Sequence, residues 1–225
     1  MNSEPLRQTL ALAAMLVLVL WTASCGTAPT GNPGAPTQVA ESGPVAMATI
    51  DNLQAAFDGE SNAAAKYAAF AAEADSKGFA RTGSLFRAAG QAEEIHARNH
   101  ADVIRKMGAE PKAIVKTPVV GSTAENLRKA IEGETYERDT MYPDFIRQAR
   151  DAGNAAAVRT MNLARSAEAE HARLYEQALG ELGSGASAAT SYFVCPVCGF
   201  TTAGMEGMSK CPACFTEKER FIVVS

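Results

Sequence analysis

Aromatic residues and strong net charge are both scarce in this sequence of 225 residues. Only 7% of the residues are aromatic while alanine is abundant, a composition that favours closely packed helices. The formal net charge is −4, and the lysines and arginines are scattered rather than gathered in a basic stripe. We therefore expect no nucleic-acid partner. An apolar content of 47% is still enough to build a core.

The N-terminal apolar run is too short for a comfortable membrane span. Leu10–Trp21 has twelve uncharged residues, whereas a transmembrane helix needs about 20. With Arg7 before it, the run is typical of a secretory signal. The tetrapeptide that ends at Cys25 resembles a bacterial lipobox, although Thr22 stands where leucine is usual. We expect residues 1–24 to be a signal peptide and Cys25 to be lipidated. Ordinary signal cleavage and an uncleaved membrane anchor are the alternatives.

The segment that follows has little to bury. Gly26–Pro44 is rich in glycine, proline, threonine and serine. Such a segment cannot offset its ordering entropy, so residues 25–48 are predicted to be a flexible tether. Together with a lipid on Cys25, this predicts an exported, membrane-anchored bacterial lipoprotein that faces the periplasm or the cell exterior.

A helical pattern begins at Thr49 and predicts one domain over residues 49–183. Three of the expected helix ends lie next to a glycine, a capping box opens at Ser122, and Pro143 should kink the third helix. The two outer connections are short and the middle one, 108–121, is long. This connectivity predicts an all-α, ferritin-like four-helix bundle. The expected helices are roughly 50–77, 80–107, 122–153 and 154–182.

The two helix pairs also repeat. Ala56–Ser61 matches Ala130–Thr135, and Ala92–Arg98 matches Ala167–Arg173. Each repeat places glutamates in the middle of apolar helix stripes that should face the core. Four carboxylates buried together would repel one another, so a positive partner is required among them. These glutamates are Glu60, Glu93, Glu134 and Glu168.

Two histidines complete a metal-ligand pattern. His96 and His171 each follow a core glutamate by three residues and share its helix face. One glutamate on each of two helices, with Glu-x-x-His on the other two, is the ligand set of di-iron or di-manganese bundle sites. Iron or manganese suits these oxygen-rich ligands better than zinc. His100 follows His96 by four residues and is expected behind the ligands or on the surface.

The C-terminal segment carries the other four of the five cysteines. Residues 184–190 form a linker, and residues 191–225 are too few to build a core without a metal. Two Cys-x-x-Cys knuckles predict a tetrahedral four-thiolate site for iron or zinc. Two disulfides are the remaining alternative in an oxidising compartment. The cysteines are Cys195, Cys198, Cys211 and Cys214.

From about Ile50 to the C-terminus, the sequence resembles the rubrerythrin family. The resemblance rests on both Glu-x-x-His motifs, on the C-terminal knuckles with Gly199, and on three short motifs that begin at Gly59, Gly133 and Met141. It implies a rubredoxin-like iron domain at the C-terminus, with zinc as the alternative metal. It also implies two irons in the bundle, bridged by Glu93 and Glu168.

The resemblance further implies individual roles. Glu60 and Glu134 would be terminal ligands, and His171 would hold one iron. The other iron would switch between Glu137 when oxidised and His96 when reduced. Tyr67, and with it Tyr142, would donate a hydrogen bond to the ligands or simply fill the core. Glu137, His96 and Tyr67 are therefore the catalytic candidates.

The family resemblance implies a function in oxidative stress defence. The expected reaction is the two-electron reduction of hydrogen peroxide to water, with electrons relayed by the rubredoxin-like centre. A head-to-tail homodimer is expected, and an exported location favours a periplasmic cytochrome or similar carrier as the external donor. A ferritin-like ferroxidase or storage protein is one alternative, and an electron carrier without turnover is the other.

Overall fold

The computed structural model describes residues 43–185 and 187–225. The predicted signal peptide, Cys25 and most of the predicted tether lie outside these residues. Within the described part of the chain, no helix is long and apolar enough to cross a membrane.

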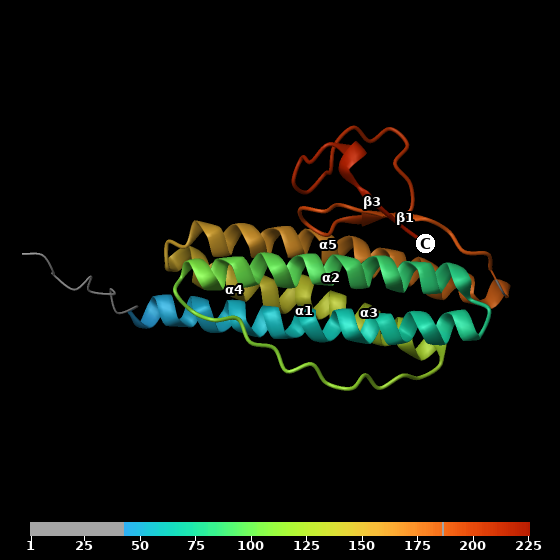
Figure 1. Cartoon of the computed structure of the whole chain (residues 1–225), viewed down its shortest axis with the longest axis horizontal. Coiled ribbons are helices and arrows are strands. Elements are labelled where there is room, and N and C mark those ends of the chain that lie inside the picture. The colour runs from blue at the N-terminus through green and yellow to red at the C-terminus, as the bar shows by residue number, and fades with distance from the viewer. Residues whose placement is uncertain (1–42, 186) are drawn as a thin grey trace, which may run out of the picture. The chain divides into compact units, whose positions relative to one another are not determined.

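The described chain folds into a helical bundle followed by a small sheet (Figure 1). The first helix begins at Pro44, six residues before the expected start, and proline is well suited to the first turn of a helix because it has no N–H to satisfy. The first pair of helices packs together, and the second pair does the same. The α-helices are α1 Pro44–Ser76, α2 Ala80–Lys106, α3 Thr123–Tyr136, α4 Tyr142–Asp151 and α5 Ala155–Glu181.

The third predicted helix is divided by a π-helical turn rather than only kinked. This turn, Glu137–Met141, joins α3 to α4 directly before Pro143. Proline lacks an N–H and would clash with the carbonyl four residues earlier, so the helix widens here. The capping box at Ser122 forms as predicted, with the Ser122 side chain and Glu125 bonded reciprocally.

The long crossover between α2 and α3 is held along α1 by three polar side chains spaced one helical turn apart. Gln54 bonds both backbone groups of Lys112, and Asp58 Oδ1 accepts from the Ile114 N–H at 2.7 Å. Asn62 accepts from the Lys116 N–H at 2.9 Å. These bonds satisfy crossover backbone groups that a regular sheet would otherwise pair.

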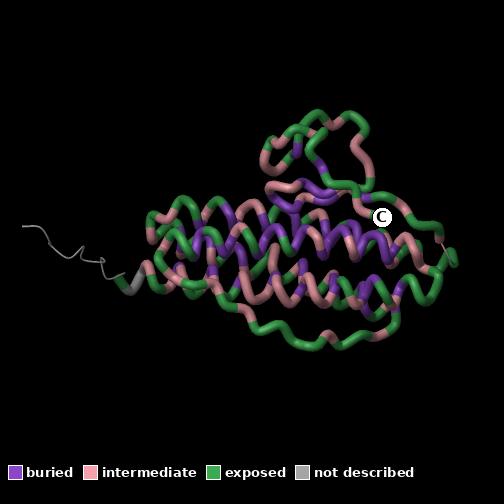
Figure 2. The backbone as a smooth tube through the Cα atoms, viewed as in Figure 1, coloured by how far each residue is buried: buried purple, intermediate pink, exposed green. Residues whose placement is uncertain are grey.

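Buried residues lie along the helices of the bundle (Figure 2), and the apolar ones form two clusters. One contains Tyr67, Phe70, Phe86 and Tyr175, whose rings pack at centroid distances of 5.2–6.3 Å. The other is built around Leu53, Ile104, Tyr142 and Met161. The buried carboxylates lie on the helices between these clusters.

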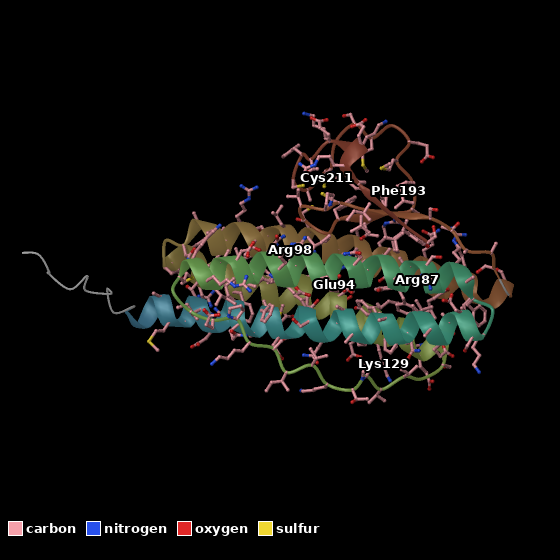
Figure 3. All side chains as sticks on the ribbon, in the orientation of Figure 1. Arg87, Glu94, Arg98, Lys129, Phe193 and Cys211 are labelled. Atoms are coloured by element: carbon pink, nitrogen blue, oxygen red, sulfur yellow. The ribbon has the colours of Figure 1, made fainter. Side chains whose placement is uncertain are left out.

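The C-terminal module is a three-stranded antiparallel sheet with the order β2-β1-β3. Its strands are β1 Tyr192–Val194, β2 Thr201–Thr202 and β3 Ile222–Val224. The module packs against α2 and α5 of its own chain (Figure 1). Cys211 and Phe193 lie within it (Figure 3), and the four cysteines are part of its small core. The fold is thus the predicted ferritin-like bundle with a rubredoxin-like module.

Candidate metal centres

The four core glutamates and two histidines converge in the bundle as two overlapping groups. In each group the ligand atoms lie within 4.8 Å of one another. One group consists of Glu60, Glu93, His96 and Glu168, and the other of Glu93, Glu134, Glu168 and His171. Glu93 and Glu168 belong to both groups. They therefore lie where carboxylates that bridge two metals would lie.

Helix periodicity explains this convergence. α2 presents Glu93 and His96 inward, whereas Glu94 and Arg98 on the same helix are exposed (Figure 3). His96 Nδ1 lies 2.8 Å from Glu93 Oε2 and 3.1 Å from Glu168 Oε1. In the other half, His171 Nδ1 lies 3.0 Å from Glu168 Oε2 and 3.4 Å from Glu93 Oε1. The two half-sites therefore mirror each other, as the repeat predicts.

Unpaired buried atoms show that this cluster suits metal ions. The four glutamates are 0–1% exposed. Buried polar atoms are normally hydrogen-bonded, yet several here have no partner in hydrogen-bond geometry among the described residues, although some lie close to one another. Divalent cations between the carboxylates would satisfy them, and carboxylate oxygens with one imidazole per metal are suitable ligands for iron. The atoms are Glu60 Oε2, Glu93 Oε1, Glu134 Oε2, both carboxylate oxygens of Glu168 and His171 Nδ1.

Two tyrosines hydrogen-bond to Glu60 and Glu134, each of which belongs to only one of the two ligand groups. The Tyr67 hydroxyl donates to Glu134 Oε1, and the Tyr142 hydroxyl donates to Glu60 Oε1. Each tyrosine comes from the opposite repeat to the glutamate that it holds. The structure thus gives Tyr67 the hydrogen-bonding position considered for it, and it gives Tyr142 the same position.

In the absence of metal, the cluster holds protons. Burial, followed by repulsion from Glu93, raises the pKa of Glu134 to about 7. Burial disfavours charged His96, but Glu168 and Glu93 outweigh it and raise the pKa of His96 to about 10. Burial, then His96, lowers the pKa of His100 to about 3. Metal ions must therefore displace protons from the cluster when they bind.

Glu137 lies outside both ligand groups. It is half-buried at the start of the π-helical turn, and a Cβ added to Gly59 would lie 4.0 Å from its Oε1. Burial, then the charge of Glu134, raises the pKa of the Glu137 carboxyl. His96 occupies the cluster instead, so the exchange of Glu137 and His96 at one metal stays a prediction.

The four C-terminal cysteines form the second candidate centre. Their sulfurs lie within 4.8 Å of one another, and the Cys195–Cys214 and Cys198–Cys211 sulfur pairs are each 3.5 Å apart. A tetrahedral ion about 2.3 Å from each sulfur requires edges of about 3.8 Å, close to this spacing. All four are free thiols in the structure, which favours the metal site over two disulfides.

His96 connects the two centres. Its Nδ1 faces the carboxylates, and its Nε2 lies 3.0 Å from the carbonyl oxygen of Cys198. A carbonyl can only accept, so Nε2 carries the proton and Nδ1 is free to bind metal. His171 has the same arrangement, with Nε2 3.0 Å from Thr201 Oγ1, which itself donates to the Gly199 carbonyl. The cysteine module therefore fixes both imidazoles.

Gly199 allows this close approach. Its φ is +75°, and a Cβ there would lie only 2.3 Å from His96 Nε2. The equivalent residue of the second knuckle is Phe215, which adopts φ 62° and is 72% exposed. A side chain is thus tolerated in this turn when it faces solvent. Gly199 instead faces His96, which leaves no room for a side chain.

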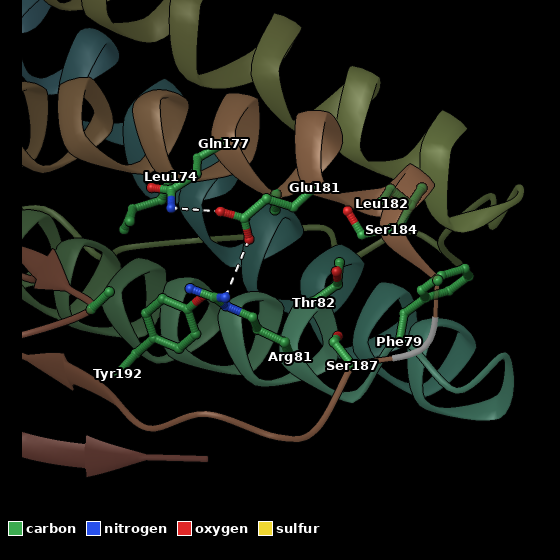
Figure 4. Close-up of a pocket in the computed structure, with 13 residues that line it drawn as sticks. Phe79, Arg81, Thr82, Leu174, Gln177, Glu181, Leu182, Ser184, Ser187 and Tyr192 are labelled. Carbon is green, nitrogen blue, oxygen red and sulfur yellow. Dashed lines mark hydrogen bonds and ion pairs between the residues drawn. The ribbon is translucent and has the colours of Figure 1, made fainter.

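A separate pocket of about 270 Å³ lies between α2, α5 and β1 (Figure 4). Arg81 and Glu181 form a 3.3 Å ion pair there, and Gln177 donates to Glu181. None of the residues predicted as metal ligands lines this pocket. It is therefore distinct from both candidate centres.

Two residues that join the module to the bundle were not found from the sequence. Thr201 gives no sequence signal for its contact with His171, and Asn99 gives none for its 2.9 Å bond to the Val197 carbonyl. His100 is fully buried and bonds Tyr142, so it lies behind the ligands and not on the surface. The first of the two positions expected for His100 is therefore the correct one.

Comparison with known proteins gives a consistent result. The rubrerythrin family matches residues 51–179. Nigerythrin of Nitratidesulfovibrio vulgaris is 38% identical over 81% of this chain and 90% of its own length. Rubrerythrin-2 of Clostridium acetobutylicum is 36% identical over 77% of this chain and 95% of its own length.

Solved structures agree with the sequence comparison. The fully reduced, all-ferrous form of nigerythrin has a TM-score of 0.73 and 35% identity, and the match covers 86% of this chain and 99% of that one. A bacterioferritin from Desulfovibrio desulfuricans, at 19% identity and a TM-score of 0.58, shares the bundle fold. The chain therefore belongs to the rubrerythrin family.

Proposed function

We propose that this protein, a di-iron protein with a rubredoxin-like iron site, reduces hydrogen peroxide to water. The balanced reaction consumes one peroxide, two electrons and two protons and releases two waters. The observation that carries the proposal is the position of His96, which reaches the carboxylate cluster with Nδ1 and the Cys198 carbonyl with Nε2. An iron store needs no such connection to a second redox centre.

When bound, two irons would supply the two electrons that cleave the O–O bond. Glu93 and Glu168, which belong to both ligand groups, would hold the two metals together for one substrate molecule. Tyr67 and Tyr142 orient Glu134 and Glu60 and shield them from water, since both rings are 0–1% exposed. Glu137 is half-buried beside the cluster, at the start of the π-helical turn, and its carboxyl is placed to exchange a proton with a neighbouring group.

Electrons return to the bundle through the module. From Cys198 the route passes along one residue's backbone and across one 3.0 Å hydrogen bond to the His96 ring. This route lies within one chain. The head-to-tail homodimer expected from the family stays a prediction, to be checked by light scattering after size-exclusion chromatography.

Anaerobic stopped-flow mixing tests the proposal. The fully reduced protein is mixed with hydrogen peroxide and, in parallel, with dioxygen, and both iron centres are followed by visible absorption. Rapid oxidation of both centres by peroxide supports the peroxidase. Faster reaction with dioxygen, with accumulation of iron mineral, would instead support the ferroxidase. An unreactive bundle site would leave only electron carriage.

We also propose that the protein is exported and anchored through a lipid on Cys25, with a periplasmic cytochrome or similar carrier as its donor. The support is the apolar run Leu10–Trp21 followed by Cys25. Labelling of cells with a fatty-acid analogue should mark the wild-type protein but not a Cys25→Ser variant. Label retained by the variant would contradict the anchor.

A further inference from the structure

The two sides of the carboxylate cluster differ behind their tyrosines. Behind Tyr67 lie Tyr175 and Phe86, all of them 0–1% exposed, and their rings pack against one another. Behind Tyr142 lies His100, which the repeat places where the other half has Tyr175. The Tyr67 side is closed by aromatic rings, whereas the Tyr142 side continues as a chain of polar groups.

Hydrogen-bond directions along this chain follow from the chemistry of its members. Glu60, as a metal-bound carboxylate, can only accept, so Tyr142 donates its single proton to it. The Tyr142 oxygen must then accept from His100 Nε2, at 3.0 Å. His100 Nδ1 of the neutral ring accepts from Thr160 Oγ1, at 3.2 Å. Every proton in the chain therefore points toward Glu60.

Thr160 places the outer end of the chain at the surface. It is 7% exposed and lines a groove of about 370 Å³ between α2, α5 and the first knuckle. Asp102, Lys106 and Arg159 line the same groove, so its lining is charged. Only three side chains thus separate the groove from the Glu60 carboxylate.

We propose that Thr160, His100 and Tyr142 form a proton relay from the groove to Glu60. In one transfer, a hydronium ion in the groove gives a proton to Thr160 Oγ1 and becomes water, as Thr160 gives its own proton to His100 Nδ1. His100 Nε2–H passes to the Tyr142 oxygen, and the Tyr142 proton passes to Glu60. Thr160, His100 and Tyr142 each give one proton as they receive another, so their charges do not change. Glu60 gains the delivered proton and is neutral until it passes that proton on. The use of these protons in peroxide reduction rests on the proposed function, but the relay does not.

Thr160→Val and Thr160→Ser provide the test. Valine has nearly the same shape without the hydroxyl, and serine keeps the hydroxyl without the methyl. Thr160 touches no predicted ligand, so unchanged iron content and circular dichroism should verify that both variants fold. The relay predicts that valine breaks the chain and that serine restores it.

The first readout is independent of turnover. ¹⁵N NMR of the protein loaded with diamagnetic Zn²⁺ should show His100 protonated at Nε2 and hydrogen-bonded at Nδ1. In Thr160→Val the Nδ1 resonance should move and solvent exchange of the Nε2 proton should slow, whereas Thr160→Ser should resemble wild type. A proton found on Nδ1, or equal exchange in wild type and Thr160→Val, would overturn the relay.

The second readout uses the iron-loaded protein. Proton uptake after reduced protein meets peroxide is followed with a pH indicator, and loss of the relay should slow it about tenfold or more in Thr160→Val but not in Thr160→Ser. Equal uptake rates in wild type and Thr160→Val would refute the relay and leave the peroxidase intact. If wild type itself does not react with peroxide, the proposed function fails, and the NMR result alone decides the relay.

Discussion

Replacement of Gly199 by alanine should separate the two redox centres without replacing a ligand. A Cβ at this residue would lie 2.3 Å from His96 Nε2 and 3.1 Å from the Ala92 carbonyl oxygen. Non-bonded heavy atoms settle about 3.5–4.0 Å apart, so the knuckle must retreat by about 1 Å or more. That movement stretches the 3.0 Å bond between His96 and Cys198 beyond hydrogen-bonding range.

The expected size follows from two contributions. The lost hydrogen bond is worth about 0.5–1.5 kcal/mol, and residual overlap brings the total to about 2 kcal/mol. The ratio of docked to undocked module should then fall by about 30-fold. Alanine at positive φ also costs about 1–2 kcal/mol, but this strain is present whether or not the module is docked.

Gly207→Ala is the matched control. Gly207 lies in the same module at φ +71°, and a Cβ there meets nothing within 4 Å. It therefore carries the backbone strain without the clash. Stopped-flow absorption should show the di-iron centre of Gly199→Ala oxidised by peroxide at the wild-type rate, followed by slow electron transfer from the cysteine-bound iron. Gly207→Ala should behave like wild type in both phases.

Two outcomes would refute this reasoning. Wild-type electron transfer in Gly199→Ala would show that the His96–Cys198 contact is not the route. Equal slowing in both variants would assign the effect to backbone strain in the module.

Two further predictions concern the cluster itself. In the folded, metal-free protein the pKa of Glu134 is about 7, whereas in the unfolded chain it is near 4.5. The folded state binds more protons between these values, so the free energy of unfolding should fall by up to about 3 kcal/mol as the pH rises from 4.5 to 7. Urea unfolding that shows constant or greater stability at the higher pH would contradict this. Tyr67→Phe removes the hydroxyl that donates a hydrogen bond to Glu134. Metal affinity, measured by competition with a chelator, should therefore weaken by about 1.5–3 kcal/mol. Wild-type affinity in that variant would show that the hydroxyl does not support the ligand.

Helical periodicity predicted the bundle and brought the right residues together. Glu93 and His96 share a face because they are three residues apart, and the repeat indicated that a second such pair would lie opposite. The ligand groups of the structure contain the four core glutamates and the two histidines chosen on this basis. Residue spacing within one helix was therefore enough to predict which side chains face the core.

Contacts between distant segments were harder to predict. The position of the module on the bundle depends on Gly199, Thr201 and Asn99 meeting α2 and α5, and no periodicity encodes such contacts. The π-helical turn before Pro143 was expected only as a kink, because a proline disrupts a helix without specifying how the chain adapts. Glu137 lies in that turn, so the direction of its side chain could not be predicted from regular helical periodicity.

An anaerobic peroxide titration of the fully reduced, iron-loaded protein tests the central claim most directly. Each of the three irons gives one electron and each hydrogen peroxide takes two, so complete oxidation should require about 1.5 equivalents of hydrogen peroxide per chain. The colour of the oxidised cysteine-bound iron should develop together with that of the di-iron centre. A titration that ends near one equivalent with the cysteine-bound iron still reduced would show that the module does not supply the bundle, and the account would be wrong.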